Sequence, residues 1–180
     1  LQDFDTKPDL QELVADNTFD RVVTIEDDAG NLNSSSIFGA IQPAVDEASP
    51  GDTVNASSGI YNESVEISTP NVTVSGAGDP RSSVDTTIEG LVTVSAQEAE
   101  LRTVIVAPPT FDSDSESQAV LVTASEATVD DVIVDISVEV TEPDGFFEAQ
   151  AIQVFASDSE PISDVVISDN IVIGDATQSN

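Results

Sequence analysis

Short apolar runs alternate with polar turns along most of the chain. Four of them are triplets rich in β-branched side chains: Val72–Val74, Val104–Val106, Val132–Val134 and Val165–Ile167. They recur roughly every 30 residues, a period within the range of known repeat proteins. Each of the last three follows a second apolar run: Leu91–Val94, Ala119–Val122 and Ala151–Val154. Strands at a near-constant period are typical of proteins whose units bury their apolar faces by stacking. The pattern therefore predicts an all-β protein built of stacked coils.

A helix is predicted over residues 34–51, directly before the repeats. The hydroxyls of Ser34–Ser36 are suited to cap its first turn, and Ser49-Pro50-Gly51 ends it. Its apolar face consists of Ile37, Ile41, Ala44, Val45 and Ala48. A stack of strands begins with an exposed core and an open edge, so this amphipathic helix is expected to cover the N-terminal end.

Residues 1–33 do not follow the repeat. Pro8 suits the first turn of a short helix over Asp9–Ala15, Arg21–Ile25 reads as a strand, and Asp27–Asn31 reads as the turn after it. We expect a lead-in packed on the end of the stack, with an attachment arm as the alternative. The second region, residues 34–180, holds the capping helix and about four coils. No closing cap is evident after Gly174, so the stack either continues in further chain or meets another subunit.

Three segments of the second region carry a family resemblance. They read AIQPAVDEASPGDTV at residues 40–54, GIYNESVEI at residues 59–67 and PNVTVSGAG at residues 70–78. These segments resemble the opening of pectin-lyase-like proteins, and most closely the carbohydrate-binding and sugar-hydrolase or NosD-like repeat type. The resemblance implies a right-handed, single-stranded parallel β-helix with an N-terminal capping helix. It leaves activity open, because such folds carry lyases, hydrolases, adhesins and structural proteins alike.

The charge of the chain is extreme. Its 180 residues include 35 Asp and Glu against 4 Lys and Arg, which gives a formal charge of -31. The acidic residues are scattered among apolar ones, which indicates a solvated acidic surface on a packed core. Charges on such a surface repel one another in dilute buffer, where the screening length is about 10 Å, and far less at molar salt, where it is about 3 Å. The composition predicts adaptation to very high salt, in an extreme halophile or its virus. It disfavours nucleic acid as a partner, because phosphates need cations.

The absence of several residue types restricts the reactions that the protein could catalyse. The chain has no Cys and no His, and no apolar run reaches the roughly 20 residues that span a bilayer. Pectate lyases of the resembled architecture use Ca²⁺ with an Arg or Lys base, and polygalacturonase-like enzymes use aspartates with a His. Arg102 is the sole basic residue in the repeat strands here, and adjacent aspartates such as Asp130-Asp131 face opposite sides of a strand. We therefore assign no catalytic residue and favour a protein that is not an enzyme.

The carboxylates offer one candidate cation site. Aligning the triplets places four residues at the same position in successive coils: Asn71, Thr103, Asp131 and Asp164. A direct stack would set Asp131 about 5 Å from Asp164, where like charges repel unless a cation or a proton intervenes. Oxygen ligands suit Ca²⁺ or a monovalent cation, with Asp130 or Asp135 as helpers. The alternative is that these carboxylates point into salty solvent.

Two further features are candidate contact sites. Phe146 and Phe147 lie in an insertion between strands, where they could bind a ligand, cover the coil or meet a neighbouring subunit. Four Asn-x-Ser/Thr sequons are glycosylation candidates: Asn33, Asn55, Asn62 and Asn71.

Two classes of function fit this pattern. We favour a non-catalytic structural or adhesive β-helix module of an extracellular or cell surface, an appendage or a virus particle, acting as a homo-oligomer or in a larger surface assembly. The alternative is a polysaccharide-binding or polysaccharide-degrading domain. Convergent carboxylates and aromatic rings across the coils would support that alternative, and a flat acidic flank would count against it.

Overall fold

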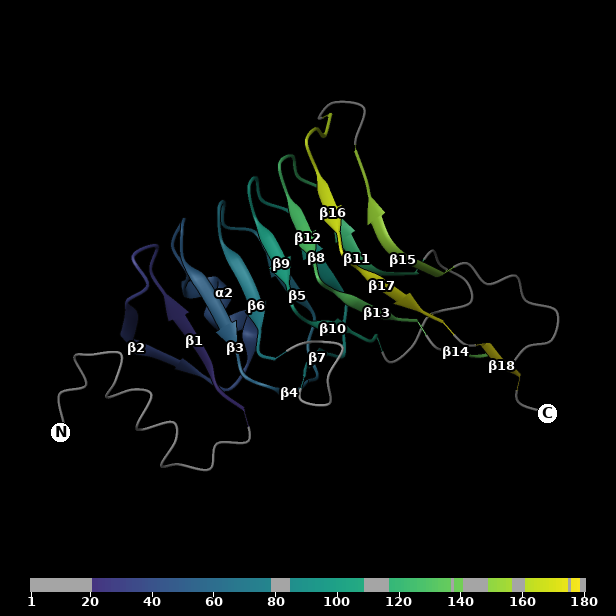
Figure 1. Ribbon diagram of the computed structural model, residues 1–180, viewed down its shortest axis with the longest axis horizontal. Coiled ribbons are helices and arrows are strands. Elements are labelled where there is room, and N and C mark those ends of the chain that lie inside the picture. The colour runs from purple at the N-terminus through teal and green to yellow at the C-terminus, as the bar shows by residue number, and fades with distance from the viewer. Residues whose placement is uncertain are drawn as a thin grey trace.

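Most of the described chain is β-structure, arranged mainly in parallel sheets (Figure 1). The structure is a computed structural model, and it describes residues 21–78, 85–108, 117–136, 138–140, 149–156, 161–174 and 176–178. The described ranges contain one helix, α2 (Ile41–Glu47). No helix in them is both long and apolar enough to cross a membrane.

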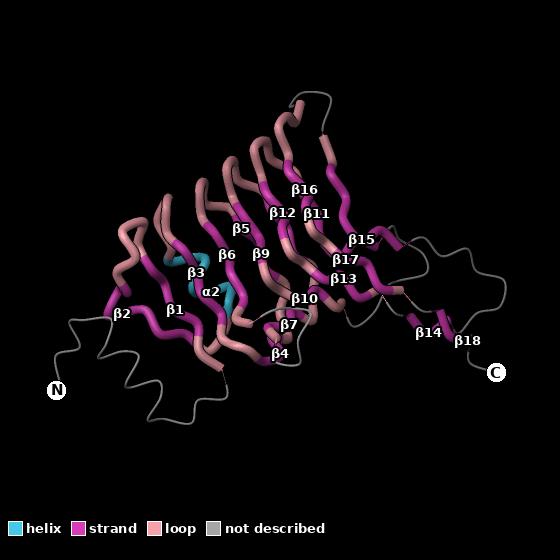
Figure 2. Tube along the Cα trace, viewed as in Figure 1, coloured by secondary structure: helices cyan, strands magenta, loops and turns pink. Residues whose placement is uncertain are grey.

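Three sheets contribute to one core, and Figure 2 shows how their strands follow one another along the molecule. Sheet A has the strand order β16 (Val166–Ser168), β12 (Thr128–Asp130), β9 (Glu100–Arg102), β6 (Thr73–Gly76), β3 (Thr53–Ala56), β1 (Val23–Glu26) and β2 (Leu32–Phe38). Sheet B has the order β17 (Ile171–Ile173), β13 (Ile133–Asp135), β10 (Ile105–Val106), β7 (Thr86–Ile88) and β4 (Gly59–Tyr61). Sheet C has the order β15 (Ala149–Val154), β11 (Ser117–Val122), β8 (Val92–Val94) and β5 (Val65–Ile67). A separate parallel pair consists of β14 (Val138–Val140) and β18 (Ala176–Gln178).

The chain visits the three sheets in rotation. From β3 onward, and apart from the pair β14 and β18, consecutive strands join sheets A, B and C in turn, so three strands make one rung. In sheet A, Thr73 lies opposite Glu100, which follows it by 27 residues. Glu100 in turn lies opposite Thr128, after a rung of almost the same length. The next step in the sheet, from Asp130 to Ser168, spans 38 residues. The fourth rung is therefore longer than the two before it.

Alternate residues of each strand point into a continuous apolar core. In sheet A, Val74, Leu101 and Val129 form one inward column in which every residue is 0% exposed. Sheets B and C supply equivalent columns: Ile88, Val106 and Val134 in sheet B, and Ile67, Val94 and Val122 in sheet C. Branched side chains fill a pleated, buried surface well. Each rung therefore covers the apolar surface of the rung before it.

The register confirms one sequence repeat and corrects the other. The runs Leu91–Val94, Ala119–Val122 and Ala151–Val154 all lie in sheet C, with Val92, Val120 and Ile152 in register. The four triplets are not equivalent. Val72–Val74 and Val165–Ile167 enter sheet A, whereas Val104–Val106 and Val132–Val134 enter sheet B. The predicted alignment was wrong because strands of both sheets carry the same apolar pattern.

The N-terminal edge of sheet A is extended by two antiparallel strands. β1 pairs with β3, and β2 pairs with β1, so the strand predicted at Arg21–Ile25 is present and packs on the stack. The turn predicted at Asp27–Asn31 is also present, because the Asp27 carboxylate accepts the Asn31 backbone N–H at 2.7 Å. The helix predicted at Asp9–Ala15 lies outside the described residues. The predicted boundary after residue 33 falls inside β2 (Leu32–Phe38).

The capping helix is present but shorter than predicted. Ser34–Ser36 lie in β2, so their predicted role as helix caps was wrong. Ile37 also lies in β2, whereas Ile41, Ala44 and Val45 are buried on α2 as expected. Pairing with β1 on both sides of the serines, at Leu32 and at Ile37 and Phe38, overrides their local helix signal, since it satisfies backbone groups of the segment.

Candidate functional site

The structure does not bring the predicted cation ligands together as expected. Asp130 lies opposite Ser168, and Ile133 lies opposite Ile171, so the residue level with Asp131 is Asp169. Asp164 is instead level with Glu126, because Thr128 pairs with Val166. The predicted stacking of Asp131 on Asp164 is therefore wrong, because the apolar run after Asp131 belongs to sheet B and the run after Asp164 belongs to sheet A. Asp130 accepts a hydrogen bond from the Ser168 hydroxyl at 2.6 Å, and Asp135 ends β13.

Five acidic residues with positive φ lie at corners between sheets: Glu98, Glu126, Asp131, Asp164 and Asp169. Several corner residues have positive φ angles, a region that Asn and Asp tolerate better than other side chains. One corner column holds Asn71, Glu98, Glu126 and Asp164, and a second holds Thr103, Asp131 and Asp169. Within the described ranges, no group of three or more carboxylates is arranged to hold a metal ion. Cation binding thus stays a prediction, without the pair of ligands proposed for it.

The outward side chains of sheet A form a polar flank. One row across the sheet consists of Thr24, Asn55, Ser75, Arg102, Asp130 and Ser168. The parallel row consists of Glu26, Thr53, Thr73, Glu100 and Thr128. Neighbours interact, because the Thr73 hydroxyl donates to Glu100 at 3.3 Å and Arg102 pairs with Glu100 at 3.9 Å. Neither row contains an aromatic ring, which is the group that sugar platforms use most.

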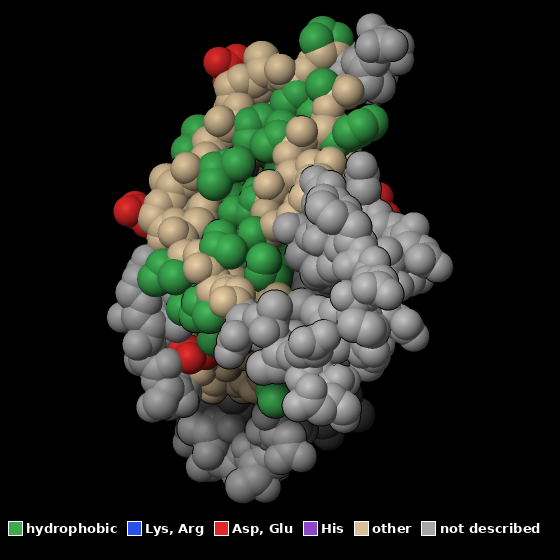
Figure 3. Space-filling model, turned by 90° about the vertical axis from the view of Figure 1, so that its right-hand side faces the viewer, with side chains coloured by type: hydrophobic (Ala, Val, Ile, Leu, Met, Phe, Trp, Pro, Cys, Tyr) green, Lys and Arg blue, Asp and Glu red, His purple; other side chains and the backbone are tan. Residues whose placement is uncertain are grey.

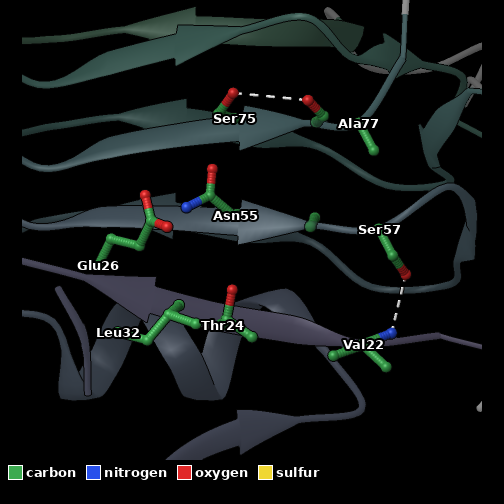
Figure 4. Close-up of a pocket in the computed structure, with 10 residues that line it drawn as sticks. Val22, Thr24, Glu26, Leu32, Asn55, Ser57, Ser75 and Ala77 are labelled. Carbon is green, nitrogen blue, oxygen red and sulfur yellow. Dashed lines mark hydrogen bonds between the residues drawn. The ribbon is translucent and has the colours of Figure 1, made fainter. Parts of the chain in front are cut away.

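A pocket of about 340 Å³ lies at the N-terminal end of this flank. Figure 4 shows Thr24, Asn55 and Ser75 on three neighbouring strands of the flank, with Glu26 beside them and Leu32 below. The backbone N–H of Val22 donates to the Ser57 hydroxyl at 2.8 Å and so closes one end. Most of the lining surface is apolar, and the lining includes Val22, Leu32 and Ala77. The hydroxyl, amide and carboxylate groups beside them can exchange hydrogen bonds with a small ligand.

Side chains from the N-terminal region satisfy the exposed edges of sheets B and C. Arg21 donates from Nη1 to the carbonyl oxygen of Ile60 on β4 at 2.7 Å. Gln42 pairs with β5 in the manner of a strand, because its amide oxygen accepts the Glu66 N–H at 2.6 Å and its amide nitrogen donates to the Glu66 carbonyl at 3.3 Å. Sheet A is instead extended at this end by β1 and β2, and β2 is its edge strand.

The N-terminus of α2 is capped by a residue that lies far from it in the sequence. Ala40, at the N-cap position, makes no side-chain hydrogen bond to the helix. The Glu63 carboxylate instead accepts the N–H groups of Ile41 at 2.7 Å and Gln42 at 2.9 Å. A negative charge at this place satisfies unpaired donors and interacts favourably with the helix dipole. Glu63 closely follows the buried Tyr61, so the turn between β4 and β5 fixes the helix in place.

At the C-terminal end of the stack, no contact of this kind is formed among the residues that the structure describes. Seven large apolar residues there are 37–55% exposed, and we call them the open end: Val154, Phe155, Val166, Ile167, Ile171, Val172 and Ile173. Three of them continue the inward columns that are fully buried in earlier rungs, namely Ile167, Val172 and Val154. Figure 3 looks onto this end and shows hydrophobic side chains across its centre, with acidic side chains toward the rim.

The structure describes the predicted glycosylation sites but not the predicted aromatic contact residues. Phe146 and Phe147 lie outside the described residues. Among the sequons, Asn62 and Asn71 are exposed, Asn55 is half-buried on the polar flank, and Asn33 lies in β2. The capping contacts of Arg21, Gln42 and Glu63 were not predicted. Glu63 lies in the turn between β4 and β5, and no local sequence pattern indicates that its carboxylate reaches α2.

Comparison of the chain with known proteins finds no match among family models, curated proteins or solved structures. Function is therefore inferred from the geometry of the polar flank, the capped end and the open end.

Proposed function

We propose that this protein is a rigid, non-catalytic β-helix module of a structural or adhesive assembly at an extracellular surface, an appendage or a virus particle in high salt. The observation that carries the proposal is the contrast between its two ends. At the N-terminal end, α2 packs on the core and Arg21 and Gln42 contact the edge strands of sheets B and C, whereas the apolar residues of the last described rung are partly exposed at the open end. Such a unit gains stability from whatever stacks on it, as repeat units do.

We take the fold to be a right-handed parallel β-helix. The rotation of consecutive strands through three parallel sheets supports this proposal, and crossovers between parallel strands of one sheet are almost always right-handed. The resemblance of residues 40–78 to pectin-lyase-like proteins agrees with it.

The polar flank supports a scaffold more than a catalyst. Its two rows alternate hydroxyls, amides and carboxylates without an aromatic ring in either row. The two acidic residues nearest the centre of the flank, Glu100 and Asp130, are held by Thr73, Arg102 and Ser168. These features suit a solvent-exposed outer face of a scaffold.

A second function, binding of a polysaccharide, is supported by the pocket beside Thr24, Asn55 and Ser75. Its hydroxyl and amide groups match the hydrogen-bonding capacity of sugars. We rank it second because nothing in its described lining offers a ring on which a sugar could stack.

Two measurements test the proposals. An antibody against the chain should label the surface of intact cells or particles from the source, and the purified chain should release no reducing ends from neutral or acidic polysaccharides. Polysaccharide retention by the wild type that is lost in Asn55→Ala, but kept in the exposed-site control Asn62→Ala, would support the second function. Internal labelling, or cleavage of a polysaccharide, would overturn the first.

A further inference from the structure

The four Asn-x-Ser/Thr sequons of the chain differ in how the fold presents them. They begin at Asn33, Asn55, Asn62 and Asn71. A sequon is the acceptor sequence for an N-linked glycan, and in a folded protein it is expected to act in a surface loop. The transferase must reach two groups together, the side-chain amide of the asparagine and the hydroxyl two residues later. A sequon is therefore usable in the folded protein only where both groups are accessible.

The sequon at Asn62 lies in the turn between β4 and β5, outside both strands. Asn62 and Ser64 are exposed, whereas Glu63 between them is half-buried. The Asn62 amide forms no hydrogen bond with any other residue that the structure describes. The Ser64 hydroxyl accepts the Leu91 N–H at 3.3 Å, and a hydroxyl that accepts a hydrogen bond keeps its own proton to donate. Both groups of this sequon are therefore accessible.

Two neighbours of this turn leave the acceptor amide uncovered. The Glu63 carboxylate is directed at α2, where it accepts the N–H groups of Ile41 and Gln42. It therefore does not place its charge beside the Asn62 amide, where it would repel the phosphate of a sugar donor. In the next rung, Gly90 lies so close to the turn that a Cβ on it would overlap the Glu63 carbonyl oxygen. The next rung thus supports the turn with backbone, and no side chain at this position covers the sequon.

The sequon at Asn55 is part of sheet A. Asn55 is half-buried inside β3, opposite Thr24 of β1 and Ser75 of β6. The hydroxyl of this sequon belongs to Ser57, which accepts the Val22 N–H at 2.8 Å. Because strands on both sides hold this backbone, a transferase cannot take up the segment without opening the sheet.

The sequon at Asn71 has an exposed asparagine but an engaged hydroxyl. The backbone of Asn71 donates to the Gln97 carbonyl oxygen and accepts the Gly51 N–H, both at 3.0 Å. Two residues later, Thr73 is half-buried in β6, and its hydroxyl donates to the Glu100 carboxylate at 3.3 Å. The proton that a transferase would recognise is therefore already used within sheet A.

We infer that Asn62 is the N-glycosylation site of the folded protein, and that Asn55 and Asn71 stay unmodified. Asn33 lies in β2 rather than in a loop, so it stays unmodified as well. This inference rests on the extracellular location proposed above. The sugar comes from a polyprenyl-phosphate-linked donor. The Asn62 amide nitrogen forms a bond to the anomeric carbon of the first sugar and releases one proton, while the bond from that carbon to the phosphate oxygen breaks and the phosphate leaves with the electron pair.

Intact mass spectrometry of the protein produced in its natural source tests the inference. The wild type should carry the mass of one glycan in addition to the polypeptide, and Asn62→Gln should lose that mass completely. Asn71→Gln is the matched control, because Asn71 is also an exposed sequon asparagine, and this variant should keep the glycan. A wild type without a glycan, a glycan retained by Asn62→Gln, or a glycan lost from Asn71→Gln would overturn the inference.

Substitutions at Ser64 test the role of the hydroxyl while the acceptor asparagine is unchanged. Ser64→Ala should abolish the glycan, and Ser64→Thr should retain it, because Thr supplies the same hydroxyl group. A glycan kept by Ser64→Ala would contradict recognition of this sequon. Antibody labelling of intact cells or particles separates the two proposals. A labelled surface without a glycan on Asn62 overturns this inference alone and leaves the structural role in place, whereas internal labelling overturns the proposed location and the inference together.

Discussion

Tyr61 is the one tyrosine of the chain and joins the first rung to the N-terminal strand. Its hydroxyl donates to the Ser57 carbonyl at 3.0 Å, and the Arg21 guanidinium lies 5.6 Å from the centre of its ring. Burial raises the pKa of the phenol above its ordinary value of 10.0, although the hydrogen bond with Ser57 and the charge of Arg21 act in the opposite direction. The folded protein therefore favours the neutral phenol.

This preference predicts an alkaline loss of stability. The contribution of Tyr61 is fully present below pH 10.0, the unfolded value, and is lost as the pH rises through the higher pKa of the folded protein. Titration of tyrosinate by ultraviolet absorbance should give a midpoint above 10.0 in the native protein and near 10.0 in urea, and the single tyrosine makes the signal unambiguous. Tyr61→Phe should remove this part of the alkaline loss. A native midpoint at or below 10.0 would show that burial is not the dominant cause.

The carboxylate of Glu63 is predicted to stabilise the helix that caps the stack. It accepts the N–H groups of Ile41 and Gln42, and loss of an N-terminal cap costs about 0.5–2 kcal/mol. Glu63→Ala should lower the free energy of unfolding by about that amount in urea titrations. The control is Glu66→Ala on the neighbouring strand, whose carboxylate is exposed and accepts one hydrogen bond, from Ser95 at 3.1 Å. Equal losses for the two variants would exclude a special role for Glu63.

At the scale of elements, Gly76 lies at the end of β6, where the chain approaches the next rung closely. A Cβ on Gly76 would overlap the Thr103 carbonyl oxygen and lie 2.9 Å from the side chains of Thr86 and Val104. Gly76→Ala is therefore expected to cost about 1–3 kcal/mol, as overpacking does. A Cβ on Gly39 meets nothing within 4 Å, so Gly39→Ala should change the free energy of unfolding by less than about 0.5 kcal/mol. Urea unfolding of both variants in high salt checks the difference, and a Gly76→Ala protein as stable as the control would refute the close approach.

Some elements were predictable because their signal is local. The apolar runs of sheet C, such as Ala119–Val122, have the period of one rung and were aligned correctly. The strand after Arg21 and the turn closed by Asp27 were also found, because alternation and Asx turns depend on neighbouring residues. The buried face of α2 followed from helical spacing alone.

The remaining features depend on contacts between distant residues. The cap of α2 comes from Glu63, which lies 22 residues after Ile41, and Gln42 pairs with Glu66 across 24 residues. No local pattern reveals such contacts. The error about Asp131 and Asp164 has the same origin, since strands of sheets A and B have similar sequences and pairing alone tells them apart.

At the scale of the whole molecule, repulsion within the acidic surface opposes the stacking of the rungs. Each rung places its corner carboxylates above those of the previous rung, as with Glu98, Glu126 and Asp164, at a spacing of about 4.8 Å. Hydrogen bonds relieve part of the repulsion, since Gln97 donates to Glu126 at 2.8 Å. The rest depends on the surrounding salt, because exposed charges at this spacing are screened by mobile ions.

The stability of the chain should therefore rise steeply with salt. With a formal charge of -31, the free energy of unfolding in urea is expected to rise by a few kcal/mol between about 0.1 M and 2 M NaCl, a large part of the roughly 5–15 kcal/mol typical of a domain. Urea is the proper denaturant, because guanidinium is itself a salt and would screen the charges. Screening gives most of its gain below about 1 M, where the Debye length is already about 3 Å. Sucrose, which stabilises by exclusion from the surface, should produce a smaller and more linear rise. If sucrose matches NaCl, or if stability does not respond to salt, repulsion between stacked corner carboxylates is not the force that limits this fold.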